Sequence, residues 1–176
     1  QIFYEYNPKG QLISVADKKG QVIRFRYNDL GKVSEVTDAK GSKASYEYCD
    51  GTVYNAAKKC GAGDLIRSKD SAGGIYSYQY DSLHNLIRIG NPKNGKPDQE
   101  FEEMVYWPAS SEGIGGVKSV KQPNGVIVEY KYWQDPREKD SHYKTEVKTT
   151  YNSGKTSTTS YEYFEKNRAD GSRYRY

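Results

Sequence analysis

The sequence predicts an all-β fold in which consecutive antiparallel β-hairpins form a curved, elongated repeat sheet. Three observations support this prediction. Tyrosines occur in pairs one residue apart, glycine-containing turns separate the pairs, and the spacing from Tyr6 to Tyr27 to Tyr48 is 21 residues twice over. Side chains at i and i+2 lie on one face of a strand, and a fixed period indicates an internal repeat. The pairs are Tyr4/Tyr6, Tyr46/Tyr48, Tyr78/Tyr80, Tyr130/Tyr132, Tyr161/Tyr163 and Tyr174/Tyr176, with Phe25/Tyr27 and Met104/Tyr106 in the gaps.

The first two repeats define the elements in order. Each repeat has a Tyr-x-Tyr strand, a turn opened by Asn, a strand led by Leu or Val, and a second turn opened by Asp. Asn or Asp opening a turn and Gly closing it supply a side-chain bond and a permitted positive φ. The turns and strands are Asn7–Gly10, Leu12–Val15 and Asp17–Gly20 in the first repeat, and Asn28–Gly31, Val33–Thr37 and Asp38–Gly41 in the second.

Later repeats keep one half of this unit and vary the other. The Leu or Val that leads the second strand is followed 15 residues later by a tyrosine, which predicts a hairpin of fixed register. The four cases are Leu12 to Tyr27, Val33 to Tyr48, Leu65 to Tyr80 and Val117 to Tyr132. Insertions fall in the other turn, at Cys49–Ala62, Pro108–Gly116 and Gln134–Tyr143, and a longer second turn is expected at Asn91–Gln99. Loops along one edge of a repeat array are where binding tends to occur.

The tyrosine ladder has two interpretations. Tyrosine pairs two strands apart are separated by about 9–10 Å, so we expect each pair to pack beside the Leu or Val residues of the strand between them. Such cross-strand pairs contribute roughly 0.2–1 kcal/mol each, and the ladder would then form the core. The alternative is an exposed aromatic track for sugars or another sheet.

Composition excludes several classes of partner. The net charge of +4 is spread over residues of both signs, which favours solvated strand faces over a nucleic-acid groove. No apolar stretch approaches the ~18 residues of a membrane helix, so no membrane insertion is expected. The chain begins inside a strand and stops after a tyrosine pair, so we expect residues 1–176 to be a single domain from a longer repeat array.

The repeats resemble the tyrosine-aspartate (YD) repeats of the Rhs family. Tyr80-Asp81 with Asn85-Leu86 matches the family pattern, and Tyr27-Asn28-Asp29 with Gly31-Lys32-Val33 is a variant of it. The resemblance covers nearly the whole chain, about six repeats. It implies side-by-side hairpins in a secreted or cell-surface protein; in large relatives the sheet spirals into a shell around a toxin domain. Asp135-Pro136 lacks the context of the family's self-cleaving segment, so autoproteolysis is not expected.

Cys49 and Cys60 bracket the first insertion and are the only cysteines. A disulfide between them would close a 12-residue loop and would agree with the oxidising compartment that the resemblance implies. Two free structural thiols are the alternative. A metal or redox role is disfavoured, because no third ligand lies nearby and the spacing is not Cys-x-x-Cys.

Catalytic patterns are scarce, and we expect no catalytic, cofactor-binding or metal-binding residue and no cofactor. His84 stands at a turn position where the repeat has Gly, which favours a left-handed turn residue over a general base. His142 lies in a charged loop and is expected to be solvated.

Three functional classes follow. The first is a non-catalytic structural segment of a large secreted or surface Rhs-like protein, a shell or stalk connected with toxin delivery or contact-dependent competition. Its partners would be the remaining repeats or domains of that protein, and edge-to-edge homodimers are conceivable because exposed sheet edges invite pairing. The second is a carbohydrate or cell-surface binding module that uses Tyr54, Trp107 and Trp133. The third, an enzyme, has least support.

Overall fold

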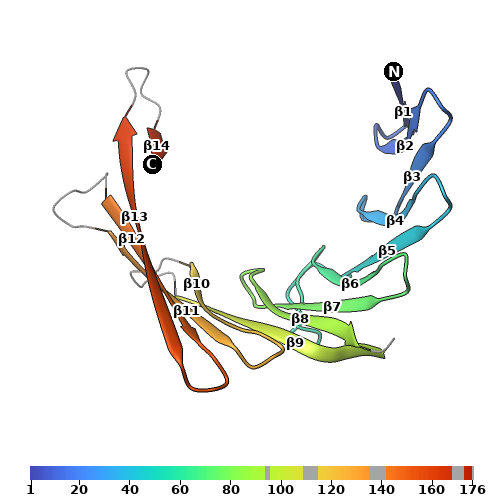
Figure 1. The fold of residues 1–176 in the computed structure, drawn as a ribbon. Helices are drawn as coiled ribbons and strands as arrows, with labels where there is room; N and C mark the ends of the chain where they lie inside the picture. The colour runs from blue at the N-terminus through green and yellow to red at the C-terminus, as the bar shows by residue number, and fades with distance from the viewer. Residues whose placement is uncertain (94–95, 109–114, 135–141, 168–172, 176) are drawn as a thin grey trace. The chain divides into compact units, whose positions relative to one another are not determined.

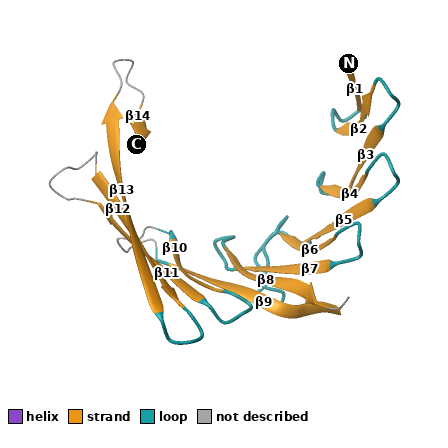
Figure 2. Ribbon diagram, viewed as in Figure 1, coloured by secondary structure: helices purple, strands orange, loops and turns teal. Residues whose placement is uncertain are grey.

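The computed structural model describes residues 1–93, 96–108, 115–134, 142–167 and 173–175, and these contain strands and turns but no helix. Fourteen strands follow one another in the sheet in chain order (Figure 1, Figure 2). Successive strands pair antiparallel, which confirms the predicted all-β series of hairpins. No helix in the described part of the chain could span a membrane. The strands are β1 (Ile2–Tyr6), β2 (Leu12–Asp17), β3 (Val22–Tyr27), β4 (Val33–Thr37), β5 (Lys43–Tyr48), β6 (Leu65–Lys69), β7 (Ile75–Tyr80), β8 (Leu86–Lys93), β9 (Lys96–Tyr106), β10 (Val117–Lys121), β11 (Ile127–Gln134), β12 (His142–Thr150), β13 (Thr156–Asn167) and β14 (Arg173–Arg175).

Contacts between residues group the chain into two compact units. Unit 1 is Gln1–Phe101 and unit 2 is Glu102–Tyr176. The expectation that residues 1–176 act as one domain remains a prediction.

The short turns of unit 1 are built on Asn or Asp, as the sequence predicts. In the turn between β4 and β5, the Asp38 carboxylate accepts hydrogen bonds from the amides of Lys40 and Ser42, both at 2.8 Å. Gly41 closes the turn with a φ of +85°, and its amide donates to the Asp38 carbonyl at 3.0 Å. Such a turn suits a hairpin because glycine adopts the left-handed conformation that ends it. The hydrogen bond from the Ser42 amide, together with that from Lys40, holds the pKa of Asp38 below its usual value.

A β-bulge recurs where the second tyrosine of each pair in unit 1 meets the following strand. The pairing register shifts between Arg26 and Tyr27, and Tyr27 then lies opposite Val33, the first residue of β4. The same shift occurs at three other positions, namely Glu5/Tyr6, Glu47/Tyr48 and Gln79/Tyr80. In each case the partners on the following strand skip one residue, such as Ser34 between Val33 and Glu35. The extra residue therefore lies on that strand, and both tyrosines of a pair stay on one face of their own strand.

The hydroxyl of the second tyrosine reaches back to the preceding strand. It donates a hydrogen bond to the backbone carbonyl of the residue 15 positions earlier, which leads that strand. The bonds are Tyr27 to Leu12 at 2.8 Å, Tyr48 to Val33 at 2.9 Å and Tyr132 to Val117 at 2.9 Å. We call this contact the tyrosine clasp. Tyr80 and Leu65 keep the 15-residue spacing, but no clasp joins them in the described structure.

The hydroxyls of Tyr48 and Tyr132 remain donors over the whole neutral range of pH. Burial, aided by the neighbouring tyrosine, raises the pKa of Tyr48 and of Tyr132 above the usual 10.0. A tyrosine whose folded pKa is raised is protonated in the folded state at every pH below about 10. Both hydroxyls therefore keep the proton that they donate to the backbone carbonyl.

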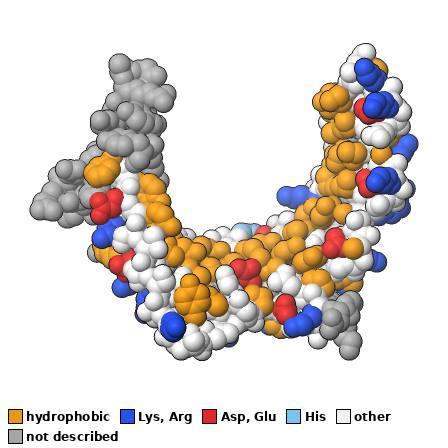
Figure 3. All heavy atoms as spheres, viewed as in Figure 1, with side chains coloured by type: hydrophobic (Ala, Val, Ile, Leu, Met, Phe, Trp, Pro, Cys, Tyr) orange, Lys and Arg blue, Asp and Glu red, His pale blue; other side chains and the backbone are white. Residues whose placement is uncertain are grey.

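The two faces of the unit 1 sheet differ in chemistry. The register places Tyr4, Val15 and Ile23 side by side on one face. On the other face, Glu35 forms ion pairs with Arg26 at 3.6 Å and with Lys43 at 3.2 Å. Figure 3 shows the same division: along the strands of unit 1, hydrophobic side chains line one side, and Lys and Arg side chains lie on the opposite side.

The tyrosine ladder forms a half-buried layer, so the expectation that it would be a core is only partly correct. Tyr27, Tyr48 and Tyr132 are half-buried, whereas Tyr4 and Tyr6 on β1 are each 58% exposed. Among the described residues, only the side chains of Cys49 and Cys60 are fully buried. In a single-layered sheet, an aromatic side chain is covered only by the side chains of adjacent strands, so the ladder stays partly exposed.

One predicted turn is wrong. The segment Asn91–Gln99 was expected to lengthen a turn, but β8 continues through Lys93 and β9 begins at Lys96. The extra residues instead lengthen the two strands of this hairpin. Residues added to both strands can pair with each other and so extend the ladder.

Replacing Tyr48 tests the clasp. Tyr48→Phe removes the hydroxyl and keeps the ring, so it should cost about 1 kcal/mol of unfolding free energy, which is roughly 2–4 °C in Tm for a chain of this size. Tyr48→Ala also removes the packing and should lower the Tm by several degrees more. The matched control is Tyr46→Phe, on the same strand, whose hydroxyl has no hydrogen-bond partner in the described structure. Thermal unfolding should show equal Tm values for Tyr46→Phe and the parent chain; an equal loss in both Phe variants would contradict the clasp.

Candidate functional site

The most elaborate local structure in unit 1 is the insertion between β5 and β6, residues 49–64. Its first and last residues form the same backbone hydrogen bond as the ends of an ordinary repeat turn. The Cys49 amide donates to the Asp64 carbonyl at 2.8 Å, as the Asn7 amide does to the Gln11 carbonyl at 2.9 Å in the first turn. Gly63, with a φ of +78°, takes the place of the turn glycine. The insertion therefore leaves the hairpin register intact.

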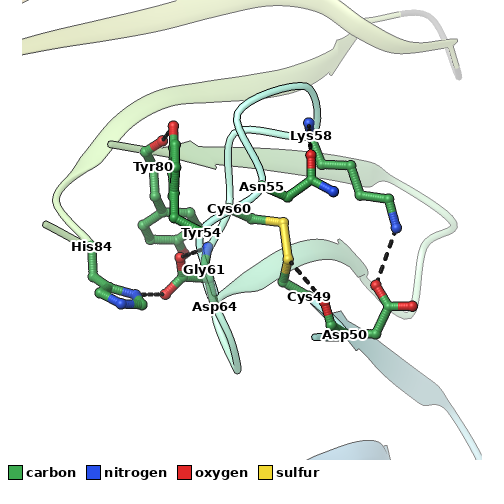
Figure 4. Close-up of a disulfide and its surroundings, with 10 residues drawn as sticks. All are labelled: Cys49, Asp50, Tyr54, Asn55, Lys58, Cys60, Gly61, Asp64, Tyr80 and His84. Carbon is green, nitrogen blue, oxygen red and sulfur yellow. Dashed lines mark hydrogen bonds and ion pairs between the residues drawn. A yellow bond between two sulfur atoms is a disulfide. The ribbon is translucent and has the colours of Figure 1, made fainter. Parts of the chain in front are cut away.

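A disulfide joins Cys49 to Cys60 and closes the insertion (Figure 4). Their Cα atoms lie 6.1 Å apart, within the usual range for a disulfide. Inside the loop, the Asn55 amide donates to the Cys60 carbonyl at 2.7 Å and the Cys60 amide donates back at 3.3 Å. The loop is thus a compact ring anchored at the end of β5.

The insertion binds the backbone of the next hairpin. The Tyr54 hydroxyl donates to the Tyr80 carbonyl at 2.8 Å, and the Tyr80 amide donates to the Lys59 carbonyl at 2.7 Å. Figure 4 shows Tyr54 and Tyr80 lying against each other beside the disulfide. Burial raises the pKa of Tyr80, and the charges of Asp64 and Tyr78 add to the effect. Tyr80, without a clasp of its own, is held by the insertion instead.

His84 forms a second link between the insertion and the next hairpin. Its φ of +63° confirms the predicted left-handed turn residue. Its Nδ1 lies 2.8 Å from Oδ1 of Asp64, whose other oxygen accepts from the Gly61 amide at 2.7 Å. A Cβ at Gly61 would lie 2.3 Å from the imidazole ring, so only glycine allows the ring to approach this closely.

The His84–Asp64 pair has the local geometry of a catalytic dyad but lacks a reacting partner. The Asp64 side chain is 11% exposed and the imidazole 54% exposed. In the described part of the chain, no hydroxyl or thiol forms a hydrogen bond with Nε2 of His84, and no group of three potential metal ligands occurs. The pair therefore fastens the insertion to the turn at His84.

An outer ion pair completes the insertion. Lys58 Nζ lies 3.1 Å from Oδ1 of Asp50, and this hydrogen bond lowers the pKa of Asp50. Both side chains are largely exposed, and surface pairs of this kind contribute little to stability.

The three aromatic residues predicted to bind ligand lie in different units. Tyr54 belongs to unit 1, whereas Trp107 and Trp133 belong to unit 2. Trp107 is half-buried, and its Nε1 donates to the Tyr130 carbonyl at 3.1 Å, with Lys118 Nζ 4.7 Å from the centre of its ring. Trp133, on β11, is 38% exposed, with Lys144 Nζ 5.9 Å from its ring centre. Tyr54 and Trp107 thus both donate to the backbone of a ladder tyrosine.

Sequence reasoning did not find Lys59, Asp64 and Tyr80 as partners of the insertion. A signal for Asp64 does exist, because aligning the insertion with the first turn places Cys49 at Asn7 and Asp64 at Gln11. No comparable signal identifies Lys59, since its contribution is a backbone carbonyl. The insertion Gln134–Tyr143 lies mostly outside the described residues, and so does the side chain of His142.

Comparison with known proteins agrees with this repeat architecture. The RHS Repeat family model matches residues 6–43 and 61–96. A crystal structure of TcdB2-TccC3-TEV superposes with a TM-score of 0.53 at 16% identity over 93% of this chain. A crystal structure of TcdB2-TccC3 without its hypervariable C-terminal region gives 0.53 at 15% identity over 99%. The Tc holotoxin pore of Photorhabdus luminescens gives 0.50 at 15% over 93%. No curated protein matches the chain significantly.

These likenesses concern the fold. The chain spans only about a tenth of each of those structures, 10%, 10% and 9% in the same order. The first matched segment runs from the last residue of β1 to the first residue of β5, the second contains β6–β8, and together they leave out most of the insertion. The resemblance to the Rhs family is therefore confirmed over residues 6–43 and 61–96, which match the RHS Repeat model.

Proposed function

We propose that the chain is a non-catalytic structural segment of a larger secreted or cell-surface RHS-type protein, where it forms part of a shell or stalk connected with toxin delivery or contact-dependent competition. The observation that carries the proposal is the clasp: the same hydroxyl–carbonyl bond, at the same spacing, joins the two strands of three hairpins. Contacts that repeat only between neighbours are typical of arrays that build extended walls.

The half-buried aromatic layer supports the same proposal. Unit 1 presents apolar side chains on one face, with Ile2, Tyr4 and Tyr6 between 57% and 58% exposed. Exposed apolar surface of this extent marks a surface that contacts other protein. The partners we propose are further repeats or domains of the same protein; an edge-to-edge dimer through β1 is a weaker alternative.

A carbohydrate or cell-surface binding module is the second candidate. Trp133 favours it, because its ring is partly exposed on β11. Tyr54 and Trp107 weigh against it, because the polar atom of each side chain already donates a hydrogen bond to a backbone carbonyl of the chain. Binding on a glycan array that is lost in Trp133→Ala would support this candidate over a structural role.

Deleting one repeat tests the structural role. Removal of residues 7–27 joins Tyr6 to Asn28 and restores the sequence of an intact repeat. A structural array should keep its β-sheet circular dichroism and unfold cooperatively with a lower Tm. The control removes only residues 7–20, which joins a tyrosine strand to the next one without a turn, and should disrupt the fold more despite its smaller size. Equal disruption by both deletions would contradict modular repeats.

The disulfide is proposed to persist in the native protein and to hold the insertion on Tyr80. The double variant Cys49→Ser with Cys60→Ser opens a 12-residue loop, which should cost up to about 3 kcal/mol and lower the Tm by about 5–10 °C. Hydrogen exchange at the Tyr80 amide should also become faster, because Lys59 no longer accepts from it. Non-reducing mass spectrometry provides the decisive check: two alkylatable thiols in the native protein would exclude the bridge.

A further inference from the structure

An apolar groove of about 400 Å³ lies on the sheet of unit 1, beside the turn at residues 17–21 and the turn that begins at Asp38. Ile2 on β1, Val15 on β2 and Ile23 on β3 line it, together with the carboxylate of Asp17. Ile2 is 57% and Ile23 41% exposed. Apolar walls with a few polar groups are typical of sites that take a small ring.

A later repeat of unit 1 shows a tyrosine at the corresponding position. Tyr76 on β7 stands where Ile23 stands on β3, because each lies four residues before the second tyrosine of its strand. The Tyr76 hydroxyl donates to Oδ2 of Asp70 at 3.4 Å, a long hydrogen bond, and the side chain is half-buried. A phenol ring therefore fits against this kind of turn with its hydroxyl directed at the aspartate that opens the turn.

The aspartates of these turns keep one carboxylate oxygen for a further donor. Oδ1 of Asp17 accepts hydrogen bonds from the amides of Lys19 and Gln21 at 2.8 and 2.9 Å, and Oδ1 of Asp70 likewise accepts from two amides of its own turn. At Asp70 the second oxygen accepts from Tyr76. In the described part of the chain no group donates to Oδ2 of Asp17, although its side chain is half-buried.

Shape and hydrogen bonding, rather than net charge, indicate the ligand. The charged side chains that line the groove are Asp17, Asp38 and Lys40, so both signs are present. A phenol is neutral, offers a ring to the apolar walls and offers one donor to a carboxylate oxygen. An aliphatic group would leave Oδ2 of Asp17 without a donor.

We propose that this groove binds a tyrosine side chain of a partner protein. The ring would pack on Ile2, Val15 and Ile23, and its hydroxyl would donate to Oδ2 of Asp17. The site goes beyond the proposed structural role, because a wall of repeats needs no ligand at this position.

The surroundings of the groove favour a protein over a free phenol as the source of the ring. Tyr4 and Tyr6, on the same face of β1 as Ile2, are each 58% exposed. Exposed apolar surface that continues past a pocket is typical of a protein contact. A partner that inserts a tyrosine would cover these side chains as well.

Peptide probes test the site on the whole chain. The blocked peptide Gly-Tyr-Gly is titrated into the isotope-labelled chain and followed by NMR, and the methyl signals of Val15 and Ile23 should shift and saturate. The matching peptide with phenylalanine should bind about fivefold more weakly, because it lacks one hydrogen bond. Tighter binding of p-cresol than of the tyrosine peptide would identify a free phenol as the ligand and would overturn the choice of a protein partner.

Three chain variants locate the contact. Asp17→Asn keeps a side chain that can open the turn, as Asn7 does, but replaces Oδ2 with an amide donor, so the tyrosine peptide should bind about fivefold more weakly. The matched control is Asp70→Asn, which makes the same change in charge away from the groove and should leave binding unchanged. Ile23→Tyr places a ring of the chain itself in the groove and should abolish binding.

The outcomes that would overturn the proposal are specific. Absence of saturable shifts at the groove, shifts confined to other residues, or an equal loss in Asp17→Asn and Asp70→Asn would each do so. Unchanged binding by a folded Ile23→Tyr chain would also contradict it. Shifts at the groove that appear without peptide as the chain is concentrated would identify a second copy as the occupant and would overturn it too.

Discussion

The clasp between a tyrosine hydroxyl and a backbone carbonyl is the constraint on which the sheet depends. A single layer of strands has no second layer to pack against, and only two cysteine side chains are fully buried among the described residues. Each hairpin must therefore be fixed by its neighbours. The half-buried ring of the second tyrosine covers the apolar face, and its hydroxyl satisfies the carbonyl of the residue that leads the preceding strand. One residue thus sets register, packing and hydrogen bonding together.

The same constraint explains where the sheet tolerates change. Insertions enter the turn that follows the clasped tyrosine, because the amide of the first turn residue and the carbonyl of the last still pair when residues are added between them, as at Cys49 and Asp64. The added residues then become available for contacts with the next hairpin. Where Tyr80 makes no clasp, the insertion supplies two backbone bonds in its place. A scaffold position and a docking position are therefore alternative uses of the same tyrosine.

Much of the fold could be predicted from the sequence because its determinants are local. The turns opened by Asp38 and closed by Gly41 and the left-handed His84 follow from residue type. The hydrogen bond donated by the Tyr48 hydroxyl could not be predicted, because a 15-residue spacing indicates the register but does not identify the atoms that are in contact. The docking of Tyr54 on Tyr80 is a contact between residues 26 apart in the sequence and leaves no local pattern. The longer turn expected at Asn91–Gln99 is wrong because pairing between the two arms extends β8 and β9 into this segment.

The central claim is that the clasp hydroxyls are hydrogen-bonded in solution. The direct measurement is the deuterium isotope shift on the tyrosine Cζ resonances in a mixture of H2O and D2O, which resolves two signals only when a hydroxyl proton exchanges slowly. The account predicts resolved pairs for Tyr27, Tyr48 and Tyr132 and single averaged signals for Tyr4 and Tyr46. Averaged signals for all five tyrosines would contradict it.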